Sequence, residues 1–338
     1  MADKHPADLR VAVLGTGLIG GSILVRLRQL GVDVAGWDPD PHAATHARQH
    51  DVPFFPDLAD AVAGRDVVFL GGPLSALPDN LAAAVKHTDP GCVITDVGSV
   101  KAPIAAYARE NGWAHRFVPG HPMAGKEHSG LLAADPTLFT GAAWVLCPQP
   151  GVALQAFRLL AGLVTTALEA KVVPLESAPH DAIVALSSHI PHLLAGSLAG
   201  GAGRSALRQG VLSLAAGSFR DGTRVAGTPS ARTVDMLRHN REAISHSIDL
   251  VRGFLDELTG ALDRADEAAL TGAFEEARGL RQELTGRTLT RSAERFRLDT
   301  DGAGEFDFLI GLGAAGGHLA SCTVDGTTVT YTALRPPA

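Results

Sequence analysis

The sequence predicts an α/β protein: a doubly wound parallel sheet at the N-terminus, then an all-α domain and a short C-terminal β-rich tail. Three observations support this fold class. The 338 residues exceed one usual core, and 46% of them are apolar, which favours two folded domains over a disordered chain. Short apolar runs alternate with helical patterns up to about residue 150. Helical patterns then dominate, and strand-forming residues return only near the C-terminus.

Six apolar runs predict the strands of the first domain. Several of them lack polar alternates, as expected of strands that are buried on both faces of a parallel sheet. The runs are Val11–Leu14, Val32–Trp37, Val67–Leu70, Val93–Asp96, Phe117–Pro119 and Trp144–Cys147. Segments long enough for crossover helices lie between them, namely Ile19–Leu30, Ala43–His50, Leu77–Lys86 and Pro103–Asn111. This alternation is typical of a Rossmann-type doubly wound fold.

The helical region begins after the turn-forming segment Pro148–Gly151. Strand signals nearly vanish from there to about residue 297, apart from Lys171–Pro174. The stretch Ala178–Leu198 is apolar almost all round, which predicts a helix buried inside a bundle or between subunits. Two later stretches, Ala231–Leu258 and Asp263–Glu283, are more amphipathic.

A short tail with a different pattern follows the helical region. Within Phe296–Ala338, the pair Asp325-Gly326 lies between β-forming residues, and this arrangement predicts a β-hairpin. We therefore expect three parts: a Rossmann-like domain over residues 1–150, a helical domain over residues 151–290 and the tail over residues 291–338.

Composition excludes several classes of function. A net charge of −7 and an aromatic content of 5% argue against nucleic-acid binding, although a few well-placed arginines could still hold a small acid. Cys92, Cys147 and Cys322 lie far apart and form neither a disulfide framework nor a zinc-ligand set. The N-terminus lacks a signal-peptide pattern, and no run of 18 apolar residues is free of charge and histidine. We therefore expect a cytoplasmic protein that does not enter a membrane.

A glycine-rich fingerprint follows the first predicted strand and opens the first predicted helix. Its glycines would permit a tight turn, the approach of a pyrophosphate and close packing of helix on strand. The second predicted strand ends at Asp38, where a carboxylate accepts hydrogen bonds from an adenosine ribose and repels a 2′-phosphate, so NAD is preferred over NADP. The predicted cofactor-binding residues are Gly15, Thr16, Gly17, Leu18, Ile19, Gly20 and Asp38.

Two further strand ends carry residues suited to catalysis. Ser99 follows the strand that ends at Asp96, and His121 follows the next apolar run. Since ligands bind at the carboxyl edge of such sheets, both side chains are expected near the nicotinamide. Histidine is the side chain best suited to accept an alcohol proton near neutral pH, and a serine hydroxyl can orient both partners. The alternative interpretation is that Ser99 caps a helix and His121 bonds a loop carbonyl.

The helical region adds histidines and arginines. His189 and His192 share a helix face, but no carboxylate or cysteine completes a metal-ligand set nearby, so no metal is expected. Contact with substrate and burial as satisfied core histidines both stay open for them and for His180-Asp181. Arg220 and Arg224 lie four residues apart, where they could grip carboxylates in a bidentate manner or serve as solvated charges at a helix end.

Five segments together resemble the prephenate/arogenate dehydrogenase family of tyrosine biosynthesis. They are GTGLIGGS, DVGSVK, GHPMAGKEHSG, HDAIVALSSHIPHLLA and AGSFRDGTRVAGT. They occur in the family's order and cover roughly residues 10 to 285, and the last is most similar to actinobacterial members. The resemblance implies a Rossmann domain joined to a helical domain that forms a homodimer, with the active site between the domains.

The resemblance also implies a reaction on a small-molecule substrate. A hydride passes to NAD from the ring carbon that bears the hydroxyl, and the ring carboxylate leaves as carbon dioxide while the ring aromatises. By this resemblance, His121 accepts the hydroxyl proton, and Ser99 hydrogen-bonds the hydroxyl and His121. Arg224 would bind a substrate carboxylate, His192 would contact the substrate near the ring, and Glu127 would help to gate the pocket. No metal is required.

Departures from the family pattern leave the substrate open. Many members have Asp-Pro and then a tryptophan after the residue that matches Arg224, whereas Gly227–Arg232 lacks both the acid and the aromatic. Lys126 stands where a small polar residue is often found. The substrate is thus prephenate, with a keto acid side chain, or arogenate, with an amino acid side chain. The tail is too short for the regulatory domain that some relatives append.

Three alternative functions are considered: two are other dehydrogenases, and one, a binding module, belongs to a different class. A relative in specialised metabolism would act on the 4-amino analogue of prephenate, and the altered segment after Arg224 permits this. A non-catalytic NAD-sensing module is disfavoured, because a sensor has no need of the base His121. A β-hydroxyacid dehydrogenase needs a catalytic lysine on a helix, but Lys171, the sole lysine past residue 126, lies beside a strand-like run.

Overall fold

The computed structural model describes residues 8–125 and 130–337 and divides the chain into two compact units. The first unit comprises Met1–Asp181 and Arg291–Arg335. The second comprises Ala182–Thr290 with the last residues of the chain, Pro336–Ala338. This division differs from the expected boundary near residue 150, because a helix and a strand beyond that point complete the first unit.

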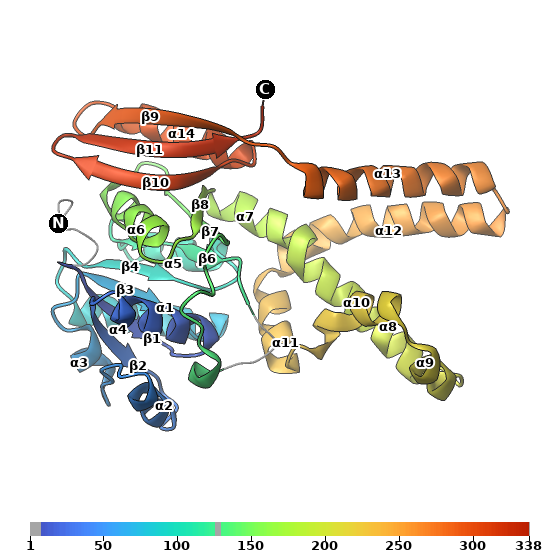
Figure 1. The fold of residues 1–338 in the computed structure, drawn as a ribbon, viewed down its shortest axis with the longest axis horizontal. Helices are drawn as coiled ribbons and strands as arrows, with labels where there is room; N and C mark the ends of the chain where they lie inside the picture. Colours follow the sequence, from blue (N-terminus) through green and yellow to red (C-terminus); the bar gives the residue numbers. More distant parts are fainter. Residues whose placement is uncertain (1–7, 126–129, 338) are drawn as a thin grey trace. The chain divides into compact units, whose positions relative to one another are not determined.

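The first unit contains a five-stranded parallel sheet with the order β2-β1-β3-β4-β5 (Figure 1). The strands are β1 (Arg10–Leu14), β2 (Asp33–Trp37), β3 (Val67–Leu70), β4 (Val93–Asp96) and β5 (Phe117–Val118). Between them lie the helices α1 (Leu18–Gln29), α2 (Ala43–Gln49), α3 (Leu58–Val62), α4 (Leu77–His87) and α5 (Ala102–Glu110), with a 3₁₀ turn η2 (Leu74–Ala76). Each residue of β3 and β4 is buried, which explains the missing polar alternates. The Rossmann-type fold class is confirmed.

A second sheet in the same unit has the order β6-β7-β8-β10-β11-β9. Its strands are β6 (Gly120–Pro122), β7 (Ala143–Leu146), β8 (Lys171–Pro174), β9 (Thr290–Arg297), β10 (His318–Asp325) and β11 (Thr328–Arg335). The expectation that Trp144–Cys147 adds a sixth strand to the parallel sheet is wrong, because β7 pairs with β6 and β8. A short apolar run has the same pattern in any buried strand, so periodicity could not assign β7 to a sheet. A 3₁₀ turn, η3 (Leu131–Ala133), precedes β7, and helix α6 (Gln155–Thr166) joins β7 to β8.

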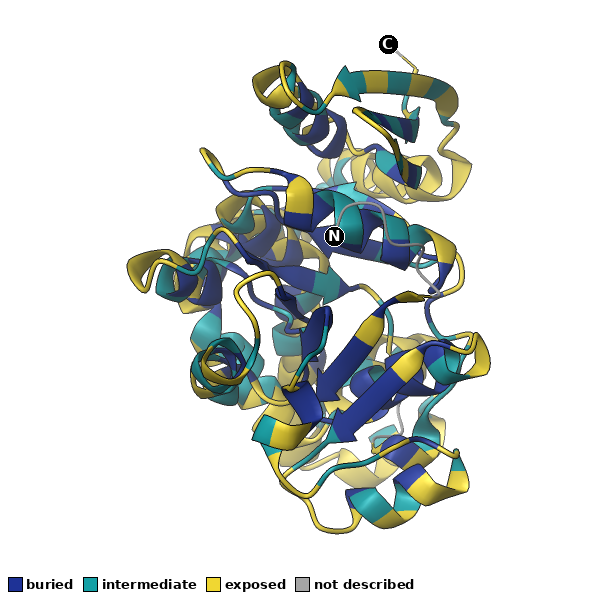
Figure 2. Cartoon of the chain, turned by 90° about the vertical axis from the view of Figure 1, so that its left-hand side faces the viewer, coloured by how far each residue is buried: buried dark blue, intermediate teal, exposed yellow. Residues whose placement is uncertain are grey.

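The C-terminal tail belongs to the first unit. Its predicted hairpin, β10–β11, is confirmed, and Gly326 takes φ +55° at the first turn position, where glycine is favoured. The tail also contains a helix, α14 (Gly302–Ala314), which the sequence pattern did not indicate. Along β11, buried residues alternate with partly exposed ones, whereas β9 alternates exposed and partly exposed residues (Figure 2). Leu309 and Tyr331 share one core cluster with Leu160 of α6 and Val172 of β8.

The second unit is helical, which confirms the all-α character of the second domain. A single helical segment, Ser177–Arg204, enters it as α7 (Ser177–Val184), a π turn η4 (Ala185–His189) and α8 (Ile190–Arg204). The other elements are α9 (Arg208–Leu214), α10 (Gly217–Thr223), the 3₁₀ turn η5 (Arg224–Gly227), α11 (Ser230–His239), α12 (Arg241–Asp263) and α13 (Glu267–Gly286). Helices α12 and α13 form a helical hairpin (Figure 1).

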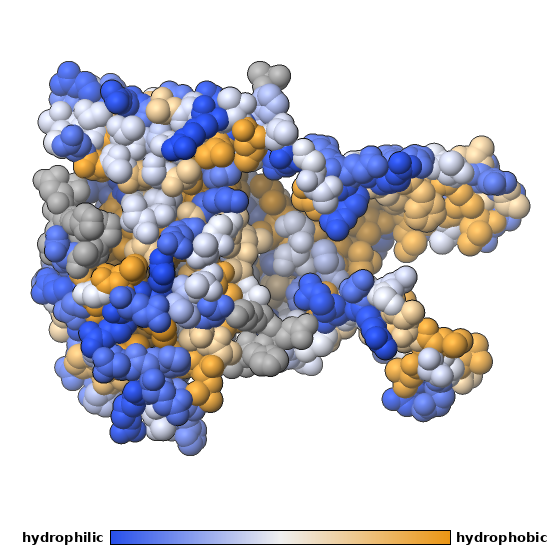
Figure 3. Space-filling model, viewed as in Figure 1, coloured by the Kyte–Doolittle hydropathy of each residue, from blue (hydrophilic) through white to orange (hydrophobic). Residues whose placement is uncertain are grey.

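Large apolar side chains are exposed on the second unit. Ile183, Leu186, Leu194 and Leu198 are each 45–49% exposed, so the apolar segment Ala178–Leu198 is not enclosed in a bundle of this chain. Further exposed apolar residues gather on α9 and on the α12–α13 hairpin (Figure 3). By length and composition, Ser177–Arg204 could also cross a membrane, but one such helix is weak evidence for a membrane protein. Of the two expectations for this segment, burial between subunits is the one that agrees with these exposed side chains.

Candidate active site

The glycine-rich turn after β1 has the geometry predicted for a dinucleotide site. Gly15 takes φ +88°, which glycine adopts most readily. A Cβ at Gly20 would lie 2.0 Å from the carbonyl oxygen of Gly15, so this glycine lets α1 approach the turn closely. A Cβ at Gly17 would meet no described heavy atom within 4 Å, which leaves open space beside the start of α1. Gly15 thus permits the turn, Gly20 permits the close helix contact, and Gly17 leaves room for a ligand to approach.

The start of α1 and the end of β2 complete this nucleotide-binding geometry. Among the described residues, no side chain caps α1 and no acidic residue lies in its first turn, so its first N–H groups suit an anion. Asp38 accepts hydrogen bonds from the Thr16 N–H at 2.6 Å and the Thr16 hydroxyl at 3.2 Å. Its other oxygen accepts from the Asp40 N–H at 2.9 Å. These bonds hold the carboxylate beside the turn, where a ribose would meet it.

A buried ion pair joins the two strand ends that carry Ser99 and His121. Lys101 and Asp96, both fully buried, form this pair. Asp96 also accepts from the N–H of Gly98 at 2.9 Å and from that of Gly120 at 3.1 Å. The Lys101 ammonium donates to the Gly120 carbonyl at 2.8 Å. The pair therefore fixes the residue that precedes His121 against the end of β4. Sequence reasoning missed this role, although Asp96 and Lys101 both lie in the DVGSVK segment.

His121 is bonded to a second histidine from a distant part of the chain. Its Nδ1 lies 2.9 Å from Nε2 of His180, and Nδ1 of His180 lies 2.8 Å from a carboxylate oxygen of Asp181. His121 is half-buried, whereas His180 and Asp181 are almost wholly buried. Burial lowers the pKa of His180, and Asp181 opposes this effect only in part. Ser99, half-buried, lies in the loop between β4 and α5 of the same unit.

The predicted substrate-binding residues other than Glu127 lie in the second unit. His192 of α8 is half-buried and bonded to the backbone of Val225 in η5, which begins with Arg224. Burial lowers the pKa of His192, and the charges of Arg232 and Arg224 lower it further. Arg232 therefore lies near His192 as a second cation, which sequence reasoning did not assign. Its position in the altered segment after Arg224 was the available signal.

The remaining predicted residues differ in their surroundings. His189 is fully buried, and its Nδ1 lies 2.9 Å from the amide nitrogen of Asn240, at the junction of α11 and α12. This contact gives His189 a role in joining helices, while contact with substrate stays a prediction. Arg220 is exposed on α10. Glu127 lies outside the described residues.

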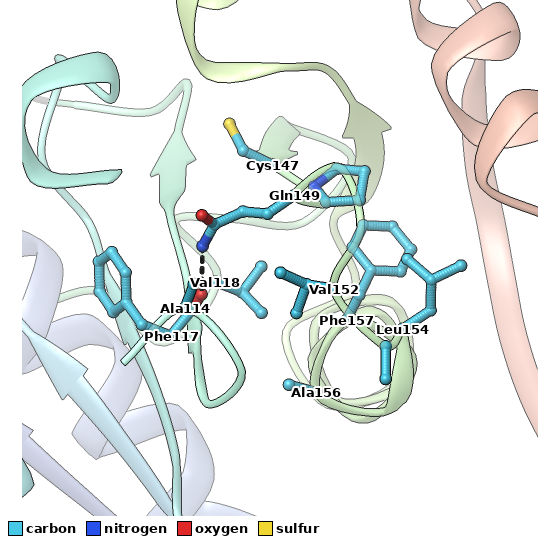
Figure 4. Close-up of a pocket in the computed structure, with 11 residues that line it drawn as sticks. Ala114, Phe117, Val118, Cys147, Gln149, Val152, Leu154, Ala156 and Phe157 are labelled. Carbon is cyan, nitrogen blue, oxygen red and sulfur yellow. Dashed lines mark hydrogen bonds between the residues drawn. The ribbon is translucent and has the colours of Figure 1, made fainter. Parts of the chain in front are cut away.

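Other reactive groups in the described chain do not form a site. Burial raises the pKa of Cys92 to about 11 and the pKa values of Cys147 and Cys322 to about 12, so these thiols stay protonated. Residues 8–125 and 130–337 contain no cluster of three or more potential metal ligands. A small pocket beside β5 offers about 10 Å³, room for hardly one water molecule (Figure 4). One wall is Gln149, whose amide donates to the Phe117 carbonyl at 2.8 Å.

Comparison with known proteins agrees with this arrangement. Residues 24–173 match the family model of the prephenate dehydrogenase nucleotide-binding domain, and residues 176–276 match that of the prephenate dehydrogenase dimerization domain. The chain is 32% identical over 286 residues to the prephenate dehydrogenase of Bacillus subtilis, covering 81% of this chain and 76% of that protein.

Solved structures show the same similarity. The arogenate dehydrogenase of Synechocystis is 27% identical with a TM-score of 0.72, covering 82% of this chain and 100% of that chain. The prephenate dehydrogenase of Aquifex aeolicus, solved in complex with hydroxyphenyl propionate and NAD+, is 25% identical with a TM-score of 0.74. That similarity covers 82% of this chain and 98% of the other.

The fold and the site define a class: nucleotide-binding dehydrogenases in which a Rossmann-type unit is followed by a helical unit. Within this class, the matches to both family models and to the Bacillus subtilis relative are specific. The chain belongs to the prephenate dehydrogenase family.

Proposed function

We propose that this protein catalyses the NAD-dependent oxidative decarboxylation of prephenate or arogenate in tyrosine biosynthesis. Prephenate would give 4-hydroxyphenylpyruvate, and arogenate would give tyrosine. The observation that carries the proposal is a histidine, His121, which lies in β6 just past the carboxyl end of β5 of the parallel sheet and is bonded to His180, in a chain that matches both domains of the family. The names of the relatives, prephenate dehydrogenase and arogenate dehydrogenase, support the same pair of substrates.

The cofactor that the site fits is NAD. The turn Gly15–Gly20 would hold the pyrophosphate at the start of α1, and Asp38 would accept hydrogen bonds from the ribose. When bound, NAD supplies the hydride acceptor. The Aquifex aeolicus relative was solved with NAD+, which supports this choice.

The chain's own residues would then bind the substrate and move one proton. His121 accepts the proton of the ring hydroxyl, while the Ser99 hydroxyl orients both groups. Arg224 holds a substrate carboxylate and His192 contacts the substrate near the ring, with Arg220 and Glu127 as further contacts. Loss of carbon dioxide aromatises the ring, so the step needs a base and cationic contacts and no metal.

The test of this function is an assay with prephenate and arogenate offered separately, each with NAD and with NADP. NADH formation with either substrate supports the proposal. If neither substrate is turned over while NAD still binds, the protein acts on another substrate, such as the 4-amino analogue of prephenate, or only senses NAD.

Replacing Asp38 with serine is expected to narrow the preference for NAD over NADP. The variant loses the carboxylate that would repel a 2′-phosphate, so the ratio of the two kcat/KM values falls about tenfold, equal to about 1.4 kcal/mol. Asp40→Ser is the matched control, because Asp40 carries the same charge two residues away. If selectivity is unchanged in Asp38→Ser, Asp38 does not meet the ribose.

Replacing Arg224 with alanine is expected mainly to weaken substrate binding. Arg224 is exposed in this structure, and a bound substrate carboxylate would desolvate it. Loss of such a desolvated charge pair costs about 2–5 kcal/mol, so KM should rise at least about 30-fold while NAD binding is unchanged. Arg204→Ala, at the exposed end of α8, is the control for a simple change of charge in the same unit. An unchanged KM in Arg224→Ala contradicts a role for Arg224 in binding.

The partner that the second unit fits is another copy of this chain. Residues 176–276 match a dimerization domain, and the same region exposes the apolar side chains of α7, α8, α9 and α12. Burial of this surface in a homodimer would remove it from water. We expect the dimer to act in the cytoplasm, without nucleic-acid or membrane partners.

A further inference from the structure

We propose that His180 and Asp181 are positioning residues for His121, and that they select Nε2 of His121 as the nitrogen that takes the substrate proton. The proposal rests on the function given above, in which His121 is the base. The three side chains form a connected series within the first unit, although His121 and His180 are 59 residues apart in sequence. Asp181 is the end of the series farthest from the substrate.

Asp181 is held at the start of α5 by two backbone donors. One of its oxygens accepts from the Lys101 N–H at 2.7 Å, and the other accepts from the Ala102 N–H at 2.8 Å. Each carboxylate oxygen thus already faces a backbone N–H donor, and a carboxylate offers only acceptors. Asp181 is therefore an acceptor in a fixed position, and the side chain of His180 must be the donor in the bond between them.

The donor role of His180 determines which nitrogen of each ring carries a proton. His180 donates from Nδ1 to Asp181 at 2.8 Å, so in the neutral ring its Nε2 has the lone pair. That nitrogen lies 2.9 Å from Nδ1 of His121 and must accept a proton from it. The proton of neutral His121 is then on Nδ1, and its lone pair is on Nε2.

His121 can then take a proton from the substrate while its hydrogen bond to His180 stays unchanged. The hydroxyl O–H bond breaks, a bond from Nε2 of His121 to that proton forms, and the O–H electron pair enters a C–O double bond as the hydride on the same carbon would leave for bound NAD. Loss of carbon dioxide would then return an electron pair to that oxygen, which takes a proton to give the phenol. Nδ1 of the resulting imidazolium keeps its proton and its bond to His180. Asp181 stabilises the positive charge through His180, as an orienting carboxylate does in other histidine bases.

The surroundings of His180 favour the neutral ring that this series requires. His180 is 1% exposed, and burial lowers its pKa. The charged groups that act on it are Asp181, Lys101 and Asp96. Lys101 and Asp96 pair with one another, so Asp181 is left as the charge that the imidazole N–H faces.

The experiment compares two replacements of His180, one that can accept a hydrogen bond from His121 and one that cannot. Phenylalanine fills the space but cannot accept a hydrogen bond from His121, whereas the glutamine amide oxygen can take the place of Nε2. We expect kcat to fall about 100-fold in His180→Phe and less than tenfold in His180→Gln, with KM within threefold in both. Equal losses in the two variants, or an unchanged kcat in His180→Phe, would overturn the proposal.

The pH profile of kcat/KM provides a readout that a purely structural role would not move. Its acid limb reports the essential base, and Asp181→Asn removes the charge that stabilises the protonated base, so the limb should shift to lower pH. Glu110→Gln is the control, because it removes the same charge from an exposed acid at the far end of α5, the helix whose start donates to Asp181. An Asp181→Asn profile with an unmoved limb overturns the proposal.

The same set of variants also tests whether the protein folds and whether the proposed function holds. NAD affinity shows whether each variant is folded, and His180→Asn replaces His180→Phe if the latter is not, since its shorter amide cannot reach His121. His121→Asn is measured in parallel. If wild-type protein turns over neither substrate, the proposed function fails. If His121→Asn is inactive but the His180 variants are not, only the positioning role fails.

Discussion

Replacing His121 with asparagine is expected to lower kcat by about 10²–10⁴-fold, the range usual for loss of a general base. Asparagine keeps a polar side chain of similar size but has no nitrogen that accepts a proton near neutral pH. The buried Lys101–Asp96 pair that holds Gly120 is unchanged in this variant. Substrate should therefore still bind, and the loss should fall on kcat more than on KM.

Steady-state NADH formation measures this loss, with the substrate that the two-substrate assay identifies. His115→Asn is the matched control, because His115 is exposed and bonded only to a nearby loop carbonyl in the described contacts. It should keep wild-type kcat. Turnover within threefold of wild type in His121→Asn removes His121 from the role of base.

The parallel sheet could be predicted from the sequence because its strands are buried on both faces. Val67–Leu70 and Val93–Asp96 are the strands β3 and β4, with the predicted bounds. The error at β7 has a physical reason, since Trp144 is as buried in the second sheet as it would be in the first. Which sheet a short apolar strand joins depends on pairings with distant strands, and periodicity does not contain them.

The site divides in the same way into local and long-range parts. The turn around Gly15 and the position of Asp38 depend on local spacing, and the glycine-rich sequence fingerprint specifies that spacing. The bond from His121 to His180 and the two backbone bonds to Asp181 join segments far apart in sequence. The sequence singled out His180-Asp181 as a motif, but no spacing rule relates it to His121.

The tail shows another limit on what can be predicted from the sequence. Its hairpin follows from a local turn signal at Asp325-Gly326, whereas its contacts with the first unit are long-range and include one to Arg158 of α6. Glu305, a buried acid on α14, is the partner of that arginine. A single acid in an apolar segment does not reveal its partner, so the pattern around Glu305 does not predict that the tail packs on α6.

Replacing Glu305 with alanine is expected to destabilise the protein by about 3–5 kcal/mol, the usual cost of breaking a buried ion pair. Arg158 donates from Nε to Glu305 at 2.8 Å and pairs with its second oxygen through another guanidinium nitrogen. The Tyr331 hydroxyl also donates to Glu305, at 2.5 Å, and burial holds the pKa of Tyr331 well above its usual value. The variant leaves the Arg158 charge, 12% exposed, without its partner and Tyr331 without its acceptor.

Thermal and urea unfolding measure this effect, and Tm should fall by about 6–20 °C. Glu294→Ala is the matched control, because Glu294 pairs with Arg335 at 3.5 Å on the surface of the same tail. Exposed pairs contribute about 0–1 kcal/mol, so this variant should unfold almost as wild type does. A Glu305→Ala variant no less stable than Glu294→Ala contradicts the role of the buried network.

The double variant Arg158→Met with Glu305→Leu removes both charges but keeps side chains that can fill the space. It therefore distinguishes the effect of an unpaired charge from the effect of lost side-chain volume. Removing both charges leaves no unpaired ion, so stability should return to within about 1–2 kcal/mol of wild type if the apolar side chains pack well. The tail shares one core with α6 and β8, so Glu305→Ala should raise hydrogen exchange in α14, β11 and α6 together. If exchange becomes faster in the tail alone, the tail unfolds independently of α6. That outcome would contradict a single shared core.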